Sequence, residues 1–347
     1  MEIEISGRRI GAQHSPYVIA EVSANHNGQL KNALKLIYEA KVAGADAVKL
    51  QTYRPDTITL DIDKEDFKIH GGLWDGRTLF DLYREAHMPW EWHKELFDYS
   101  RELGLTIFSS PFDASAIDLL EDLNAPAYKI ASFEAVDLPL IRYAAKTGKP
   151  LIISTGLAGA EEIGEAIEAA RSAGGKQLAL LHCVSGYPAP AKDYNLRTVP
   201  EMAKRFGLPV GLSDHTLDIT TSIASVAVGA CIIEKHFTLD RRGGGPDDSF
   251  SLEPSDLKKL CVGVRDAWEA MGSACYGCRP SEEPNLKFRR SLYFVEDLKK
   301  GQVIKPSSIR SVRPGYGLPP KFMDDIIGRK VLEDVTFGTP TSFEVIG

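Results

Sequence analysis

Short apolar runs, rich in β-branched residues, alternate with longer amphipathic segments through most of the chain. The runs have the length of buried strands, and the segments between them repeat their apolar residues with the period of an α-helix. Helices are predicted, among other places, over 30–43, 90–103, 114–123, 160–172 and 220–228, and strands over 17–21, 45–51, 106–110, 127–131, 151–154, 178–183, 210–213 and 231–236. Near-continuous apolar strands separated by helices predict a parallel sheet covered on both faces.

The eight predicted strand–helix units indicate a (β/α)8 barrel. They lie within residues 1–279, close to the usual size of such a barrel, roughly 250 residues. The structural alternative is a doubly wound open sheet, which usually carries a glycine-rich dinucleotide motif after its first strand. The segment Asn25-His26-Asn27-Gly28 is not such a motif. The barrel is therefore the predicted fold.

The pattern changes after residue 279. The stretch 280–290 is rich in proline and charge and is predicted as a linker. Beyond it, three short runs at 291–296, 301–304 and 309–312 are separated by turn residues. Residues 291–347 are therefore expected to form a small, mostly irregular β domain. Such a domain buries little surface alone, so we expect it to pack on something else.

Composition narrows the functional classes. The net charge of −7 argues against a nucleic-acid-binding protein. No apolar run reaches the roughly 18–20 residues needed to span a membrane, and the first residues lack the pattern of a signal peptide, so a cytoplasmic protein is expected. Five cysteines do not suggest a disulfide framework, and Cys275 and Cys278 lack the second pair that a tetrathiolate zinc site needs.

Polar residues collect where the predicted strands end. In a parallel barrel the catalytic groups lie at these carboxyl ends and in the loops that follow them. No structural requirement places an ionisable residue at the end of nearly every strand. The residues in question are Glu21, Ser23, Asn25, His26, Lys49, Gln51, Thr52, Ser109, Ser110, Lys129, Ser132, Glu134, Ser154, Thr155, His182, Ser185, Tyr187, Ser213, Asp214, His215, Glu234, Lys235 and His236.

Two lysines within apolar strands are the most informative of these residues. Lys49 and Lys129 could lie at a solvent-exposed edge, but a buried lysine is rare unless an anion accompanies it. With serines at the neighbouring strand ends, they indicate a pocket for a phosphate or a carboxylate. Glu21 and Glu134 suit proton transfer or binding of a polyol, although surface salt bridges would explain them equally well.

Two histidines end adjacent predicted strands. His215 and His236 could each be an ordinary hydrogen-bonded core residue. If their rings converge, two imidazoles with water and a substrate oxygen would suit Mn²⁺, Mg²⁺ or a similar ion. A structural zinc site would need four closed ligands instead.

These residues lie, in chain order, within eight sequence motifs that resemble those of the sialic acid synthase family. Members of this family condense phosphoenolpyruvate (PEP) with an amino-sugar aldehyde. The motifs lie between residues 17 and 238 and read IAEVSANHNG, GADAVKLQTY, FSSPFD, AYKIASFE, ISTGL, LLHCVSGYP, VGLSDHT and IEKHF. A further block, SVRPGYGLPPKF, resembles the C-terminal antifreeze-like (SAF) domain of these enzymes. The resemblance therefore implies a barrel followed by a SAF domain.

The resemblance also implies roles, position by position. His215 and His236 match the metal ligands, and Glu21, Glu134, Tyr187 and Asp247 match residues that contact or activate the sugar. Asp248 could replace Asp247 if the loop register shifts by one. Arg313 matches an arginine that reaches the sugar site of a partner subunit, so a domain-swapped homodimer is expected. The positions that match PEP-binding residues are Lys49, Ser110, Lys129, Ser132, Ser154, Ser185 and Ser213.

Within the family, the segment 63–86 and the phrases FSLEP and RSLYF most resemble the synthases of pseudaminic acid. The implied sugar is 2,4-diacetamido-2,4,6-trideoxy-L-altrose. Synthesis of N-acetylneuraminate or legionaminate is the alternative within the same class. A non-catalytic carbohydrate-binding barrel is the alternative from another class. The loop with Trp74 and Asp75 follows the second predicted strand and is expected either to shape the part of the site that binds the 6-deoxy and 4-acetamido end of the sugar, or to be a capping loop without substrate contact.

Overall fold

Eight parallel strands form a closed barrel in the first of two compact units, Met1–Gly272 and Ser273–Gly347. The computed structural model describes residues 2–347. Each strand pairs with the next, and the last pairs with the first, which confirms the predicted fold with small shifts at the strand ends. The strands are β3 (Tyr17–Glu21), β4 (Ala47–Thr52), β5 (Thr106–Pro111), β6 (Tyr128–Ile130), β7 (Leu151–Ser154), β8 (Leu178–Cys183), β9 (Val210–Asp214) and β10 (Ile232–His236).

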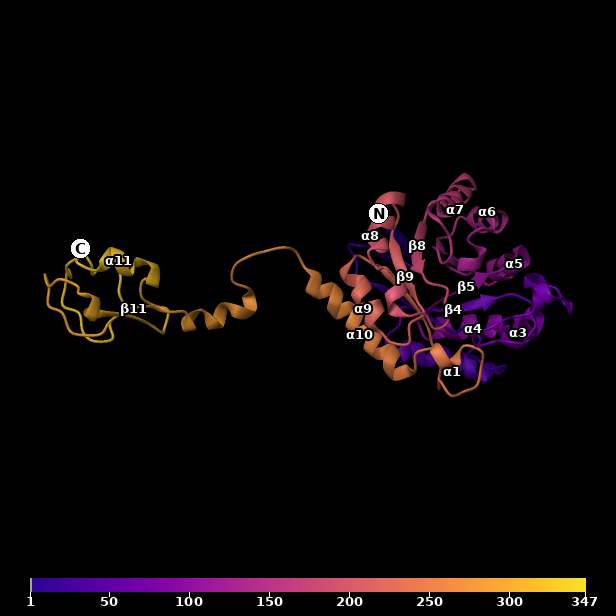
Figure 1. Ribbon diagram of the computed structural model, residues 1–347, viewed down its shortest axis with the longest axis horizontal. Helices are drawn as coiled ribbons and strands as arrows, with labels where there is room; N and C mark the ends of the chain where they lie inside the picture. The colour runs from indigo at the N-terminus through magenta and orange to yellow at the C-terminus, as the bar shows by residue number, and fades with distance from the viewer. Residues whose placement is uncertain (1) are drawn as a thin grey trace. The chain divides into compact units, whose positions relative to one another are not determined.

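Helices surround the strands and cover their outer face (Figure 1). α1 packs against α4 and α10, α6 packs against α5 and α7, and α9 packs against α10. No helix within residues 2–347 is both long and apolar enough to cross a membrane. The surrounding helices are α1 (Leu30–Ala43), α4 (Trp90–Glu102), α5 (Ala114–Asp122), α6 (Leu138–Lys146), α7 (Ala160–Ser172), α8 (Thr198–Phe206), α9 (Thr220–Ala227) and α10 (Pro254–Met271), and two short helices, α2 (Pro55–Ile58) and α3 (Leu79–Ala86), follow β4.

Local sequence explains where these helices begin and end. Asp113 and Asp137 precede α5 and α6, and each carboxylate accepts a hydrogen bond from the backbone N–H of the third residue after it, Ala116 or Leu140. α1 and α8 end at Gly44 and Gly207, whose left-handed backbone conformation is most easily adopted by glycine. Each helix therefore carries its own boundary signals, and its apolar face is free to pack on the barrel.

The interior of the barrel changes character along the strands. Alternate residues of a strand point inward, and those nearest the amino ends are apolar, as in Tyr17 and Ile19 of β3 or Ile152 of β7. The inward positions nearest the carboxyl ends are polar, as in Glu21 and Lys49. The apolar layers form a closed base, and the polar layer above it faces the mouth of the barrel.

An N-terminal hairpin, which the sequence analysis did not predict, closes the amino end of the barrel. β1 (Glu2–Ile5) pairs with β2 (Arg8–Gly11) in an antiparallel ladder. Ile3, Ile5 and Ile10 are buried in the same cluster as the inward apolar residues of the barrel strands. The hairpin therefore belongs to the core of the first unit.

The second unit is small and mostly irregular. β11 (Ser291–Phe294) pairs antiparallel with β12 (Ile309–Val312), and a separate apolar cluster includes Leu292 and Ile326 of the short helix α11 (Met323–Ile326). The predicted strand at 301–304 is wrong, because Gly301 adopts a positive φ and only Val303 makes an isolated bridge. The predicted linker largely coincides with an exposed 3-10 helix, Pro280–Phe288.

Candidate active site

A cavity of about 470 Å³ opens at the carboxyl ends of the barrel strands. This end of a parallel barrel is where the loops after the strands converge. The volume is within the range of small-molecule sites. The structure brings most of the predicted site residues to its wall, namely Glu21, Lys49, Ser110, Lys129, Ser132, Glu134, Ser185, Tyr187, Ser213, His215, His236 and Asp247.

Four buried charges form the base of the cavity, and we call them the charged floor: Glu21, Lys49, Lys129 and Glu234. Lys49 Nζ lies 2.6 Å from Glu21 Oε2 and 3.8 Å from Glu234 Oε1, and Lys129 Nζ lies 3.1 Å from Glu234 Oε1. Burial favours the neutral form of Glu234, but the two lysines outweigh it and lower the pKa of this carboxyl. The floor is therefore a compact ionic network whose lysines line the cavity.

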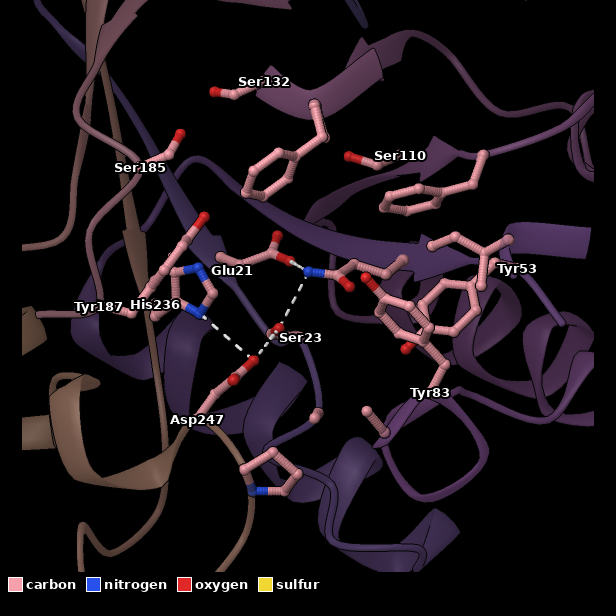
Figure 2. A pocket seen from close by; sticks show the side chains of 18 of the residues that line it. Glu21, Ser23, Tyr53, Tyr83, Ser110, Ser132, Ser185, Tyr187, His236 and Asp247 are labelled. Atoms are coloured by element: carbon pink, nitrogen blue, oxygen red, sulfur yellow. Dashed lines mark hydrogen bonds and ion pairs between the residues drawn. The ribbon is translucent and has the colours of Figure 1, made fainter. Parts of the chain in front are cut away.

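Serine hydroxyls surround the lysines. Ser110 Oγ accepts a hydrogen bond from Lys49 Nζ at 3.2 Å, and Ser213 Oγ donates to Glu234 Oε1 at 3.3 Å. Figure 2 shows Ser110, Ser132 and Ser185 along one side of the pocket. A Cβ at position 156 would lie 2.3 Å from Ser185 Oγ and 2.7 Å from Ser132 Oγ, so glycine is needed there for these two serines to approach. Lysines and hydroxyls together can bind an anion with charge-assisted hydrogen bonds.

Two residues assigned to the site by resemblance lie elsewhere. Ser154 is fully buried at the end of β7, its Oγ has no hydrogen-bond partner, and it does not line the cavity. Arg313 follows β12 in the second unit. Asp248 is also outside the cavity wall, because its carboxylate accepts hydrogen bonds from Asn27 Nδ2 at 3.0 Å and from the Gly245 backbone at 2.8 Å. The structure thus favours Asp247 over its neighbour.

The two histidines converge, as predicted. The ring centroids of His215 and His236 are 5.3 Å apart. His215 Nδ1 lies 2.8 Å from the Val184 carbonyl oxygen, so a proton on Nδ1 would leave the Nε2 lone pair available. His236 Nδ1 has no hydrogen-bond partner, and Asp247 Oδ2 lies 3.8 Å from it (Figure 2). Burial first of all, and then nearby cations, keep the pKa of His236 well below its usual value, so the ring is neutral.

This donor set fits a divalent ion with open coordination positions. Neutral imidazoles are good ligands for such an ion, and two of them would leave positions for water and substrate. No three His, Cys, Asp or Glu side chains of residues 2–347 are gathered closely enough to form a complete ion cage. An ion at His215 and His236 would therefore need ligands in addition to these two side chains.

A buried ion pair behind the cavity holds the strands that carry the histidines. Lys235 Nζ lies 3.1 Å from Asp214 Oδ2, and both side chains are almost fully buried. Ser222 Oγ donates to the same carboxylate at 2.6 Å, and Lys235 Nζ also donates to the Thr216 carbonyl. Asp214 and Lys235 are register partners of β9 and β10. The pair therefore fixes the backbone next to His215 and His236 from the side away from the cavity.

Hydrogen-bonding groups line the side of the cavity near Asp247. Ser23 Oγ donates to Asp247 Oδ2, and Gln51 Nε2 donates to Glu21 Oε1 and to Ser23 Oγ, both at 2.9 Å (Figure 2). Glu134 Oε2 is buried without a hydrogen-bond partner, and burial raises the pKa of this carboxyl to about 7, although Lys129 opposes the shift. Glu134 can therefore gain or lose a proton near neutral pH.

The loop after β4 gives the cavity an apolar side. We call this side the apolar wall, and it consists of Ile58, Ile69, Trp74, Leu79 and Leu82. Trp74 Nε1 donates to the Pro246 carbonyl at 3.1 Å, and its ring centroid lies 5.9 Å from that of Tyr187. Of the two possibilities for this loop, the structure supports a contribution to the pocket.

Several residues of the cavity were given no role by the sequence analysis. Strand alternation could have identified three of them. Glu234 stands two residues before His236 in β10, Gln51 stands two residues after Lys49 in β4, and Cys183 stands two residues after Leu181 in β8, so each must face inward with its neighbour. The others follow strand ends by distances that alternation does not determine. The residues without a predicted role are Ser23, Gln51, Tyr53, Tyr83, Cys183 and Glu234.

Comparison with known proteins agrees with the predicted family. A pseudaminic acid synthase of Campylobacter jejuni is 44% identical over 93% of this chain and 94% of its own length. A pseudaminic acid synthase of Helicobacter pylori is 42% identical over 95% of this chain and 98% of its own length. The crystal structure of N-acetylneuraminic acid synthetase from Leptospira borgpetersenii, in complex with citrate, is 30% identical and covers 83% of this chain and 96% of that one with a TM-score of 0.73.

Family models divide the sequence in the same way as the fold does. The model of the SAF domain matches residues 289–342, in the second compact unit. The model of the NeuB family matches residues 36–276, which include most of the barrel and nearly all of the cavity wall. The resemblance inferred from the sequence is therefore confirmed, and the chain belongs to the NeuB family.

Proposed function

We propose that this protein is a pseudaminic acid synthase, which condenses PEP and water with 2,4-diacetamido-2,4,6-trideoxy-L-altrose and releases phosphate. The observation that carries the proposal is the charged floor, in which Lys49 and Lys129 lie beside serine hydroxyls and a converging histidine pair. The relatives of this chain in Campylobacter and Helicobacter, both named pseudaminic acid synthases, support the choice of sugar. The cytoplasmic location remains a prediction.

PEP is an anion at neutral pH, and the cavity offers it cationic and hydroxyl donors. Lys49 and Lys129 would bind its phosphate and carboxylate with charge-assisted hydrogen bonds, and Ser110, Ser132 and Ser185 would orient them. In the free protein Lys49 lies beside Glu21 and Lys129 lies beside Glu234, so each buried lysine has a carboxyl partner before the substrate arrives, although burial raises the pKa of Glu21. The serine hydroxyls of the site supply further donors for an arriving anion.

We propose in addition that His215 and His236 hold a divalent ion, Mn²⁺ or Mg²⁺. When bound, such an ion supplies a Lewis acid beside the sugar aldehyde. Removing it with a chelator should lower phosphate release by about 100-fold or more, because several kcal/mol of charge stabilisation are lost, and added Mn²⁺ should restore it. His236→Ala should also lose bound metal, measured by elemental analysis. The exposed His14→Gln should retain it, and full metal content in His236→Ala would contradict the assignment.

The condensation requires one carbon–carbon bond and three proton transfers. The π electrons of PEP form a bond from C3 to the aldehyde carbon, whose oxygen gains a proton. Water then bonds to the electron-poor C2 and loses a proton, which leaves a hydroxyl on C2. The C2–O bond to phosphate breaks as this hydroxyl gives its proton to the departing phosphate and the ketone forms. Glu134, with its unpartnered oxygen and a pKa near neutrality, is suited to accept the proton from water. Glu21, Tyr187 and Asp247 would bind the sugar.

The ionisation of Glu134 should be visible in both rate and stability. If its carboxylate accepts the proton, kcat/KM should rise with pH through about 7. The pKa of Glu134 in the folded protein lies above the usual 4.5, so ionisation of this carboxyl opposes folding. The free energy of unfolding should therefore fall as the pH rises from 4.5 to 7. This loss is roughly 3 kcal/mol, and Glu134→Gln should remove it.

Chemical unfolding at a series of pH values, together with kcat/KM profiles, measures both effects. Glu165→Gln is the matched control, since this glutamate is exposed on α7. An unchanged pH dependence of stability in Glu134→Gln would contradict the raised pKa. A rate profile that falls through neutral pH would assign Glu134 as an acid instead.

We also propose that the active form is a homodimer in which Arg313 serves the site of the other subunit. Within residues 2–347 the Arg313 side chain makes no salt bridge, so its charge is available to a partner or a ligand. Arg313→Ala and Lys129→Met should each be nearly inactive at PEP concentrations well below the KM of Lys129→Met, but co-expressed chains should form mixed dimers with one intact site. Random pairing would restore about a quarter of the wild-type sites. No recovery, measured as phosphate release, would show that Arg313 acts on its own subunit or not at all.

The proposed function itself is tested with a panel of hexoses. The purified protein is incubated with PEP, Mn²⁺ and one sugar at a time, and released phosphate is measured. Turnover with 2,4-diacetamido-2,4,6-trideoxy-L-altrose should exceed turnover with the precursors of N-acetylneuraminate and legionaminate. A preference for either precursor would favour the alternative synthases. Sugar binding without phosphate release from any mixture would favour a non-catalytic carbohydrate-binding barrel.

A further inference from the structure

The apolar wall is built on a ribbon that reaches over the cavity. Backbone hydrogen bonds of 2.9 Å join Ile69 N to the Arg77 carbonyl and Gly76 N to the Ile69 carbonyl, which form a narrow hairpin with Trp74 near its tip. The tip is attached to the loop after β10, since Trp74 Nε1 bonds to the Pro246 carbonyl. The wall is therefore fixed at both ends and presents a defined surface.

This surface is uncharged, and only its tip, Trp74, reaches Tyr187 beside the histidines. Every residue between positions 53 and 86 that lines the cavity is aliphatic or aromatic. Figure 2 shows Tyr53 and Tyr83, which flank the wall, on the side of the pocket opposite His236 and Tyr187. The lysines, the histidines and most of the serines belong to the barrel strands and their ends. The cavity thus has a polar half formed by the barrel strands and their ends, and a mostly apolar half in which only Tyr53 and Tyr83 carry hydroxyl groups.

The chemistry of the sugar decides what can lie against such a wall. A hydroxyl group placed there would lose its hydrogen bonds to water without replacement, which is unfavourable. A methyl group would gain by leaving water. With the aldehyde beside the histidines, the far end of an open-chain hexose points toward the opposite side of the pocket. That end carries either a methyl or a hydroxymethyl group at C6.

We propose that the apolar wall binds the C6 methyl group of the sugar and selects 6-deoxy amino sugars over their 6-hydroxy counterparts. The proposal rests on the proposed function, because it places the aldehyde at the histidines. An apolar surface discriminates against an added hydroxyl only moderately. The expected preference in kcat/KM is therefore about 10- to 100-fold.

The test compares 2,4-diacetamido-2,4,6-trideoxy-L-altrose with the same sugar bearing a C6 hydroxyl, at saturating PEP. The wild-type protein should prefer the 6-deoxy sugar by about 10- to 100-fold. Ile69→Thr and Leu79→Gln place a polar group in the wall and should reduce this preference to within about threefold. The change should occur in the KM of the 6-deoxy sugar, with the KM of PEP unaltered. Leu73→Gln is the matched control, because Leu73 lies in the same ribbon, is 50% exposed and does not line the cavity.

A binding measurement separates this proposal from the proposed function. Calorimetric titration with each sugar, without PEP, should show tighter binding of the 6-deoxy sugar to the wild type and to Leu73→Gln, but not to Ile69→Thr. Selective binding without phosphate release would overturn the proposed function and leave the wall proposal standing. The wall proposal would be overturned if the wild type used and bound the two sugars equally. It would also be overturned if the variants weakened the binding of both sugars equally, or if neither sugar bound.

Discussion

Replacing Lys129 by methionine should lower kcat/KM for PEP by about 10²- to 10³-fold, mainly through a higher KM for PEP. The lysine is almost fully buried in the charged floor, where its ammonium group lies 3.1 Å from Glu234. Its removal deletes a charge-assisted hydrogen bond to the substrate and leaves the carboxylate of Glu234 with Lys49, at 3.8 Å, and the Ser213 hydroxyl as partners. Truncating one member of a buried charged pair costs about 2–5 kcal/mol, and each 1.4 kcal/mol is a factor of ten.

Steady-state kinetics with PEP as the varied substrate measures this effect. Lys129→Arg keeps the charge and should retain more activity than Lys129→Met. The exposed Lys31→Met removes a positive charge from α1 and should leave the kinetics unchanged. If Lys129→Met and Lys31→Met bind PEP equally well, Lys129 does not belong to the PEP site.

Replacing Lys235 by methionine should lower the free energy of unfolding by about 3–5 kcal/mol, the usual cost of leaving one buried charge without its partner. Lys235 and Asp214 are both almost fully buried, and burial lowers the pKa of the lysine even though Asp214 opposes the shift. Without the ammonium group, Asp214 would keep only Ser222 and the Thr216 backbone N–H as donors. Denaturant unfolding of the full chain, followed through the transition of the barrel, measures the loss.

The double variant Lys235→Met/Asp214→Leu provides the decisive comparison. Replacing both members of a buried ion pair by apolar residues is often nearly neutral, so the double variant should recover most of the stability lost in Lys235→Met. Lys94→Met removes the exposed pair with Asp98 on α4, where the cost should be below about 1 kcal/mol. Equal losses in Lys235→Met and Lys94→Met would show that the buried pair contributes no more than a surface one.

The strands of the barrel could be predicted because each is buried on both faces, which makes it an unbroken apolar run between turn residues. The N-terminal hairpin is buried on one face only. Its residues Ile3 and Ile5 alternate with exposed glutamates, and Ser6 and Gly7 form the turn with positive φ at both positions. This pattern is typical of a short hairpin. Its packing against the amino end of the barrel depends on contacts with residues more than 200 positions away, which no local pattern contains.

The candidate site could be predicted as a set of residues but not as an arrangement. The carboxyl ends of parallel strands meet, so Lys49, Lys129 and the two histidines could be placed together from order alone. The pairing of both lysines with glutamates depends on side-chain length and on strand register. Whether Ser154 reaches the cavity depends on how the loops cover the end of its strand. The apolar wall depends on a ribbon whose packing leaves no periodic pattern in the sequence.

The hairpin at the amino end of the barrel also affects how the chain can fold during synthesis. Ile3, Ile5 and Ile10 are synthesised more than 200 residues before Cys231 and Ile232 at the start of β10, which belong to the same cluster. The hairpin cannot be fully buried, and the ring cannot close through β3 and β10, until that last strand has emerged. Until then these isoleucines remain available to other surfaces, including that of a chaperone that binds short apolar segments.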